Sequence, residues 1–337
     1  MTGASSFLGG HILAQLLERG YKVRGSVRSQ EKADAIRRNY NAYSHKLEIL
    51  VVEDISADVS LAKLMVDAVA VVHVASPVNL NPANNERDLL RPAIKGTLNV
   101  LRAAATNGST IKRVILTSTM ATMSQVGSGP IPGKIYSEAD WNSVTWDQAV
   151  ASPDGHYVYC ASKTLAEQAA WRFMREENKA GSLGFDMVSI HPGWLLGPFV
   201  HHVERFSDLS MSLAECYETV TKRQERLPPT KVQYWTDVRD AARAHVEVLG
   251  LAKAEGRYLV ANPAKFDWKK AFSILRSRFP DQYHNAPDEP GYTVQLRPEV
   301  DVSKAEKAFG FGWTSLDQSY TDMVEQFYKL RRDGMAD

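Results

Sequence analysis

The chain has 337 residues, of which 44% are hydrophobic, so it is long enough to bury one large core or two unequal ones. Its formal net charge of +1 provides no electrostatic basis for binding nucleic acid or an anionic membrane surface. The only cysteines, Cys160 and Cys216, exclude a framework of disulfides and favour a reducing compartment, so we expect a cytoplasmic protein.

The first predicted element is a glycine-rich turn that leads into a helix. Residues 2–9 read Thr-Gly-Ala-Ser-Ser-Phe-Leu-Gly, and an apolar helical pattern continues to Leu17. Such a turn leaves backbone N–H groups free at the N-terminus of a helix. The partial positive charge there suits the binding of a pyrophosphate. Ser6 stands where the usual fingerprint has its middle glycine, which weakens the match. We still favour nucleotide binding over a plain strand-to-helix turn.

A dinucleotide-binding turn normally follows a buried strand. Only Met1 and Thr2 precede Gly3 here, so the first strand of the expected sheet is apparently missing from the chain. Three explanations are open: the numbering starts late in a longer protein, the start has been trimmed, or the sheet is built without this strand. The last of these would leave the flank of a parallel sheet uncovered.

Strand and helix patterns alternate in the rest of the first half. Apolar strand-like runs cover 21–27, 47–52, 70–74, 113–118 and 186–191. Helical patterns cover 30–39, 60–66, 86–105 and 157–177. Short apolar strands separated by helices predict an α/β fold with a Rossmann-type, doubly wound parallel sheet.

The pattern becomes irregular after Gly193. We therefore predict a dinucleotide-binding Rossmann domain in residues 1–192 and a smaller, mainly substrate-binding lobe in residues 193–337. A helical pattern at 236–249 has capping residues at its start, and we expect part of 229–252 to pack back onto the first domain.

Tyr159 and Lys163 lie four residues apart in the helical pattern 157–177. This spacing puts both side chains on one helix face, one turn apart. A neighbouring ammonium favours the phenolate, so we expect Lys163 to lower the pKa of Tyr159. A tyrosine of this kind can donate a proton to a carbonyl oxygen near neutral pH. The pair alone is a weak signal, and it gains weight from the glycine-rich turn.

Further motifs follow in a fixed order along nearly the whole chain. They are residues 2–9, 27–32, 54–55, 73–77, 86–90, 95–100, 116–119, Tyr159 with Lys163, 167–171, 191–193, 197–198 and 237–240. In combination they resemble the extended short-chain dehydrogenase/reductase family. The resemblance is greatest to its dihydroflavonol-reductase-like branch, which includes fungal methylglyoxal, aldehyde and ketone reductases.

The resemblance implies a catalytic triad. Tyr159 would be the general acid, and Lys163 would also bind the nicotinamide ribose. The third member is normally a serine after a Thr-Ser pair, and here Thr119 occupies that position, directly after Ser118. We prefer Thr119, since its hydroxyl can make the same hydrogen bond to the substrate, and keep Ser118 as the alternative.

The charge after the strand-like run 21–27, which would be the second strand of the usual fold, argues for NADP as the cofactor. NAD sites commonly place Asp or Glu there to bind the ribose 2′-hydroxyl, whereas this chain has Arg28. A guanidinium suits a 2′-phosphate, and Lys32 lies one turn further on; the alternative is a solvated surface arginine. The turn and the resemblance imply these other cofactor-binding residues: Gly3, Ser6, Phe7, Leu8, Gly9, Asp54, Ile55, Ala75, Ser76 and Pro192.

The substrate pocket is the least defined part of the prediction. Val78, Leu80, Met120 and Trp194 lie in segments that would line it. His201 and His202 have no acidic or cysteine partners at ligand spacing, so we predict no metal site. His191 is expected to be a structural histidine.

Three functions remain open from the sequence. The leading one is NADPH-dependent reduction of a ketone or aldehyde, either by a broad-range enzyme or by a ketoreductase of a secondary-metabolite pathway. The second is an epimerase or dehydratase of nucleotide sugars, against which Arg28 argues because such enzymes often retain NAD. The third is a non-catalytic NADP-binding protein, against which the intact Tyr159 and Lys163 argue. The expected partners are a small carbonyl substrate and, at most, a second copy of the chain.

Overall fold

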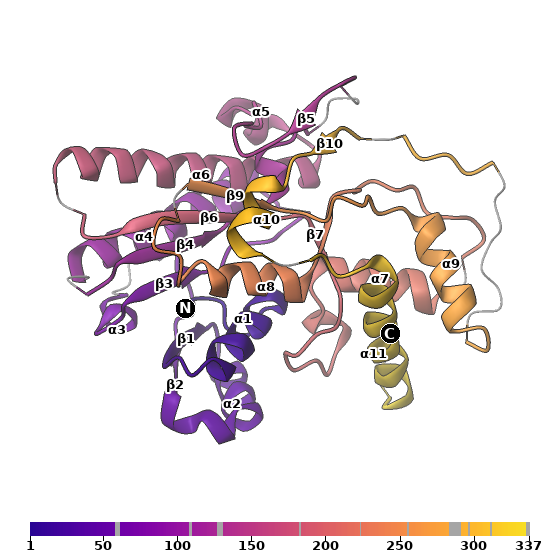
Figure 1. The fold of residues 1–337 in the computed structure, drawn as a ribbon, viewed down its shortest axis with the longest axis horizontal. Helices are drawn as coiled ribbons and strands as arrows, with labels where there is room; N and C mark the ends of the chain where they lie inside the picture. Colours follow the sequence, from indigo (N-terminus) through magenta and orange to yellow (C-terminus); the bar gives the residue numbers. More distant parts are fainter. Residues whose placement is uncertain are drawn as a thin grey trace.

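The computed structural model describes residues 1–57, 61–107, 110–126, 131–181, 183–222, 224–254, 256–282, 291–295, 297–310 and 312–334. At its centre is a parallel sheet with the strand order β3-β4-β6-β9 (Figure 1). These strands are β3 (Ala70–His73), β4 (Arg113–Thr117), β6 (Asp186–Pro192) and β9 (Gly256–Val260). Every residue of β4 is buried, as expected for a strand covered on both faces. The predicted doubly wound α/β fold is confirmed.

The first residues of the chain connect this sheet to a second parallel pair, β1 (Val23–Val27) and β2 (Leu47–Val51). Thr2 forms a parallel bridge with His73, and its N–H donates to the Val72 carbonyl at 2.9 Å. On the other side, Ser26 N–H donates to the Met1 carbonyl at 2.9 Å. Residues 1–4 therefore fill the gap between β1 and β3, at the position where we expected a strand to be missing.

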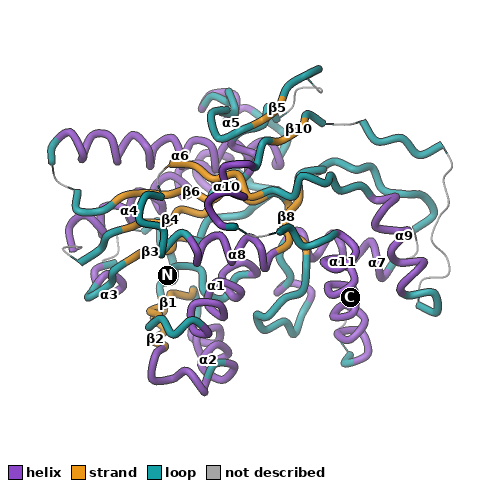
Figure 2. The backbone as a smooth tube through the Cα atoms, in the orientation of Figure 1, coloured by secondary structure: helices purple, strands orange, loops and turns teal. Residues whose placement is uncertain are grey.

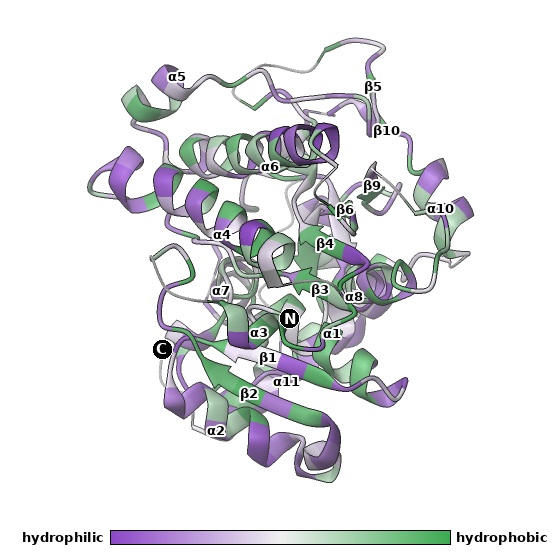
Figure 3. Ribbon diagram, turned by 90° about the vertical axis from the view of Figure 1, so that its left-hand side faces the viewer, coloured by the Kyte–Doolittle hydropathy of each residue, from purple (hydrophilic) through white to green (hydrophobic). Residues whose placement is uncertain are grey.

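Helices cover both faces of the sheet. On one face, α4 (Arg91–Asn107) packs against α6 (Gly155–Lys179), and on the other α1 (Phe7–Glu18) packs against α8 (Val238–Glu247) (Figures 1 and 3). Figure 3 shows hydrophobic colouring along β3 and β4, between these two layers. The contact of α8 with α1 brings residues 238–247 against the first half of the chain, and β9, further along, pairs with β6 in the central sheet.

The other helices of the first half are α2 (Gln30–Asn39) and the short α3 (Ala62–Met65). The bounds predicted for α2 are confirmed, and the predicted start of the next helix, Ser60, lies outside the described residues. The predicted helix 86–105 begins instead as a π-helical segment, η2 (Glu86–Leu90). Pro92, which has no backbone N–H to donate, lies directly after this wider turn.

The structure adds elements that the sequence did not predict, most of them in the C-terminal half. They are β7 (Trp194–Leu196), β8 (Trp235–Asp237), α7 (Met211–Thr221), α9 (Trp268–Arg278), α10 (Ser303–Phe309), α11 (Leu316–Arg332) and the pair β5 (Ile135–Tyr136) with β10 (Glu299–Val300). Short elements complete the chain: α5 (Trp146–Ala151), η1 (Asn41–Lys46), η3 (Met120–Thr122) and η4 (Phe206–Asp208). Long loops join these elements (Figure 2). No helix within the described ranges is long and apolar enough to cross a membrane.

Candidate active site

The glycine-rich turn is closed by Ser6, the residue that seemed out of place in the sequence. Ser6 Oγ donates to the Gly3 carbonyl at 2.8 Å and accepts from Gly9 N–H at 3.1 Å, so it caps α1. Gly3 has a φ of 69°, which favours glycine. A Cβ at Gly9 would lie 2.0 Å from the Gly3 carbonyl oxygen. The turn thus depends on glycine at both ends and on the serine hydroxyl between them.

We expect Gly9→Ala to abolish measurable NADPH binding and to lower the stability of the folded protein by about 1–3 kcal/mol, since the new methyl overlaps the Gly3 carbonyl. The matched control is Gly184→Ala, because a Cβ at Gly184 meets nothing within 4 Å. Fluorescence titration with NADPH and thermal unfolding measure the two effects. NADPH affinity of the Gly9 variant equal to that of the control would contradict a role for this turn.

Thr2 links the glycine-rich turn to the loop after β3. Its Oγ1 accepts from the N–H groups of Val74 and Ala75, both at 3.1 Å, and lies 2.8 Å from His73 Nδ1. A Cβ at Gly3 would lie 3.0 Å from Ala75 N. The loop that contains Ala75 and Ser76 therefore lies against the turn, as the cofactor prediction requires. The side chains of Phe7 and Leu8 are buried, and their backbone N–H groups belong to the first turn of α1, where a helix provides no backbone acceptor.

The charged candidates lie at the neighbouring strand ends. Arg28 follows β1 and is exposed, and Lys32 is exposed in the first turn of α2. Asp54 accepts from both the N–H and the hydroxyl of Ser56 at 2.7 Å, and these bonds lower its pKa, with a smaller contribution from the nearby Arg28. Ile55 is half-buried near Gly96 on α4. Arg28 and Lys32 are thus two exposed cations, of which Arg28 lies near Asp54 and Lys32 near Asp208.

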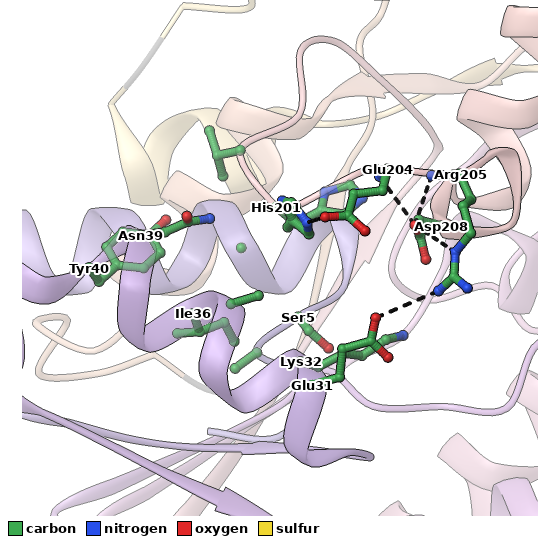
Figure 4. Close-up of a pocket in the computed structure, with 15 residues that line it drawn as sticks. Ser5, Glu31, Lys32, Ile36, Asn39, Tyr40, His201, Glu204, Arg205 and Asp208 are labelled. Atoms are coloured by element: carbon green, nitrogen blue, oxygen red, sulfur yellow. Dashed lines mark hydrogen bonds and ion pairs between the residues drawn. The ribbon is translucent and has the colours of Figure 1, made fainter. Parts of the chain in front are cut away.

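A cleft lies between the glycine-rich turn, α2 and the loop around η4 (Figure 4). Ser5 and Lys32 line one side of it, and Arg205 reaches across from the other. Arg205 lies 3.7 Å from Glu31 and 3.8 Å from Asp208. Sequence reasoning did not find this loop, since no motif marked residues 200–208.

The predicted catalytic residues come from α6 and from the end of β4. Asp154 caps α6 by accepting from His156 N–H at 2.9 Å, and it starts the helix that carries Tyr159 and Lys163. Lys163 is buried, and its Nζ donates to the Thr117 carbonyl at 2.9 Å. This bond ties the helix to the last residue of β4, just before Ser118 and Thr119.

The structure separates Thr119 from Ser118. Thr119 is half-buried, and its Oγ1 accepts from Ala121 N–H at 3.3 Å. Ser118 is 5% exposed, and its hydroxyl donates to Glu167 Oε2 at 2.7 Å, inside the protein. Successive residues at the end of a strand point in opposite directions, so only one of them can face a ligand. This geometry favours Thr119.

Burial controls the protonation of the Tyr159 and Lys163 pair. It raises the pKa of Tyr159 well above its ordinary value, and it lowers the pKa of Lys163 to about 8 against the opposing charge of Glu167. The prediction that Lys163 lowers the pKa of Tyr159 is wrong for the chain by itself. Desolvation dominates at the phenol, and the Lys163 ammonium donates to a backbone carbonyl. Tyr159 is consequently protonated at neutral pH.

The predicted pocket residues have different surroundings. A Cβ added at Gly155 would lie only 1.6 Å from the Leu80 carbonyl oxygen. The loop that contains Val78 and Leu80 therefore packs on the first turn of α6, one turn before Tyr159. Val78 is 54% exposed. Trp194 is half-buried and packs edge-to-face on two aromatic rings of the lobe, Phe266 and Trp268.

Two further predicted residues are buried near the ends of the central strands. Met120 is 2% exposed in a hydrophobic cluster with Met123 and Tyr136, so it is a core residue and its assignment to the pocket surface is wrong. Its side chain turns inward from η3, where apolar burial stabilises the turn. Pro192 is also buried, and it is the last residue of β6.

The fold and the site define a dinucleotide-binding α/β protein of the oxidoreductase type, with a glycine-rich turn before α1 and a Tyr159/Lys163 pair on α6, tied to the end of β4. The chain belongs to the NAD dependent epimerase/dehydratase family, whose sequence model matches residues 1–261.

Curated relatives match along the whole chain. It is 31% identical to the NADPH-dependent methylglyoxal reductase of Saccharomyces cerevisiae, with 98% of each chain covered. It is 32% identical to aldehyde reductase 2 of Sporidiobolus salmonicolor, with 96% of this chain and 94% of the relative covered. The crystal structure of yeast methylglyoxal/isovaleraldehyde reductase complexed with NADPH matches at a TM-score of 0.88, with 28% identity and 98% of each chain covered.

Proposed function

We propose that the protein is an NADPH-dependent reductase that converts a ketone or an aldehyde into an alcohol. The observation that carries this proposal is that α6, which bears Tyr159 and Lys163, packs against the segment of Thr119 after β4, while the glycine-rich turn follows the bridge of Thr2 to β3, the neighbour of β4. The relatives named above are reductases of small carbonyl compounds, which agrees with this chemistry.

The residues of the turn fit a dinucleotide. A side chain at Gly3 would press on the backbone of Ala75 and one at Gly9 on the Gly3 carbonyl, so both glycines permit the tight turn that leads into the N-terminus of α1, where a pyrophosphate would bind. Arg28 and Lys32 would bind the 2′-phosphate of NADPH, and Asp54 and Ile55 would contact the adenine. Ala75 and Ser76 would lie along the cofactor and Pro192 beside the nicotinamide. NADPH, when bound, supplies the hydride.

Side chains of the protein would supply the proton that the reduction requires. Thr119 would hold the substrate oxygen by a hydrogen bond, and Tyr159 would donate its phenolic proton to that oxygen as negative charge develops there. Lys163 would bind the nicotinamide ribose, and its ammonium would stabilise the phenolate after proton transfer. Val78, Leu80 and Trp194 would contact the rest of the substrate.

We further propose that residues 1–192 bind the cofactor and that the lobe after residue 193 selects the substrate. The free and buried Cys160 and Cys216 agree with a reducing compartment such as the cytoplasm. The division into a cofactor-binding domain and a substrate-binding lobe agrees with either a monomer or a homodimer. A ketoreductase of a secondary-metabolite pathway remains one specific form of the activity.

The direct test is consumption of NADPH and NADH by the purified protein with a panel of small aldehydes and ketones. We expect turnover with NADPH and little with NADH. Conversion of a nucleotide sugar with no net use of cofactor would instead identify an epimerase or dehydratase. NADPH binding without any turnover would identify a binding protein.

The pH dependence of the reaction follows from Lys163. Its pKa is lowered to about 8 by burial, so the ammonium is present below that pH and is lost as the pH rises through it. We therefore expect kcat/KM for NADPH-dependent reduction to fall as the pH rises through about 8. Lys163→Arg, whose guanidinium stays charged, should remove this fall from the initial-rate profile. A wild-type profile that stays flat as the pH rises through and above this value would contradict the role of the ammonium.

A further inference from the structure

A buried polar network lies directly behind Thr119 and Lys163. At its centre Arg257 Nε donates to Glu167 Oε1 at 2.9 Å, and the two side chains are only 8% and 1% exposed. Glu167 follows Lys163 by one turn of α6, whereas Arg257 comes from β9. The pair therefore joins the catalytic helix to the far edge strand of the central sheet.

Glu167 has several partners besides Arg257. Its carboxylate accepts from Ser118 at 2.7 Å, from Ser189 at 3.1 Å and from Trp171 at 3.1 Å. Burial opposes its ionisation, but contacts with His191 and Arg257 outweigh burial and hold the pKa of Glu167 well below its usual range. The carboxylate is therefore a fixed negative charge inside the protein.

The other guanidinium nitrogens of Arg257 donate hydrogen bonds to the segment that follows β4. Nη1 donates to the carbonyls of Glu138 and Asp140 at 2.9 and 2.5 Å, and Nη2 donates to Thr122 Oγ1 at 2.9 Å. The guanidinium also stacks over Trp141, 3.8 Å from its ring centroid. This fork geometry is specific to arginine.

Thr122 connects Arg257 to Thr119. Its Oγ1 donates to the Thr119 carbonyl at 3.0 Å, and Thr122 itself is fully buried. His191 Nδ1 lies 3.2 Å from the same carbonyl and 3.1 Å from Thr122 Oγ1. A continuous set of contacts thus runs from Glu167 through Arg257 and Thr122 to the backbone of Thr119.

We propose that Arg257 and Thr122, anchored by Glu167, are positioning residues that hold the Thr119 turn in register with Tyr159 and Lys163. The inference rests on the proposed function, because it assumes that Thr119 binds the substrate oxygen. A buried ion pair adds little net stability, since desolvation of its charges offsets their attraction. The precise placement of a hydroxyl, in contrast, strongly affects rate, and a misplacement of about 1 Å costs on the order of 100-fold.

The same sheet provides a matched control. At the opposite end of β4, Arg113 forms a two-bond pair with Asp186 at 2.7 Å and donates to the carbonyls of Val248 and Leu251. This pair joins elements of the fold as Arg257 does, but it lies at the amino ends of the strands, away from Thr119. Its replacement tests the effect of loosening the sheet alone.

The test compares Thr122→Val, Thr122→Ser, Arg257→Lys and Arg113→Lys by steady-state kinetics with NADPH, by NADPH titration and by thermal unfolding. We expect Thr122→Val and Arg257→Lys to lower kcat by about 10- to 100-fold with an unchanged Kd for NADPH. Thr122→Ser, which keeps the hydroxyl, should retain kcat, and Arg113→Lys should lower stability without lowering kcat. Because Thr122→Val changes a single buried hydroxyl, it keeps the test valid if the Arg257 variant does not fold.

Unchanged kcat in folded Thr122→Val would overturn the positioning role, as would an equal loss in Thr122→Ser. A Thr119→Val variant separates this result from failure of the proposed function. If Thr119→Val retains full kcat, the role of Thr119 in the site fails and the positioning role fails with it. If Thr119→Val loses kcat while Thr122→Val does not, only the positioning role is wrong.

Discussion

Tyr159→Phe is expected to lower kcat for carbonyl reduction by about 10²- to 10⁴-fold, the range contributed by a positioned general acid. The phenol is half-buried, and burial raises its pKa, so the wild-type group carries its proton at neutral pH. Phenylalanine keeps the ring and removes only that proton. NADPH should bind the variant with nearly wild-type affinity, because the proposed contacts with the cofactor lie mainly in the glycine-rich turn and at Arg28.

Tyr157→Phe is the matched control for this experiment. Tyr157 lies two residues earlier on α6, and its hydroxyl is 3.5 Å from Gln148 Oε1. Since successive positions on a helix face different directions, the control should retain kcat. Initial rates and NADPH titration of both variants test whether Tyr159 donates the proton. Wild-type turnover by Tyr159→Phe would remove Tyr159 from the mechanism.

Arg28→Asp is expected to reverse the preference for NADPH over NADH. Loss of a charge-assisted bond costs about 1.5–3 kcal/mol, and repulsion of the 2′-phosphate adds to this, so kcat/KM with NADPH should fall by roughly 100-fold or more. The new carboxylate can accept a hydrogen bond from the ribose 2′-hydroxyl, so kcat/KM with NADH should rise. The ratio of the two kcat/KM values is the measurement.

Arg38→Asp makes the same charge change at the other end of α2, where Arg38 is also exposed. It reports any effect of net charge alone, and we expect it to leave the cofactor ratio unchanged. Equal ratios in the Arg28 variant and in this control would defeat the 2′-phosphate assignment. A double variant with Lys32→Gln should deepen the loss with NADPH, since both cations would be gone.

Local patterns in the sequence were enough for much of the fold. The strands β1, β2, β3, β4 and β6 coincide with apolar runs, and the bounds of α2 were predicted. These elements are encoded locally, because a buried parallel strand needs a continuous apolar run and a surface helix needs a 3.6-residue period. The spacing of Tyr159 and Lys163 likewise required only the geometry of one helix.

Contacts between distant segments decided the rest. The sequence could not show that residues 1–4 bridge β1 and β3, that Ser118 turns toward Glu167 while Met120 enters the core, or that burial outweighs Lys163 at the Tyr159 phenol. The strand β9 pairs with β6, so that Gly256 lies opposite Val188, and the contact of Arg257 with Thr122 joins residues 135 positions apart. The sequence by itself determined which residues form the nucleotide turn and the Tyr/Lys pair, because both are short-range patterns. Only the tertiary structure decided which of the two hydroxyls turns into the protein interior and how burial shifts the pKa values of Tyr159 and Lys163, because orientation and desolvation depend on the packing of segments far apart in the chain.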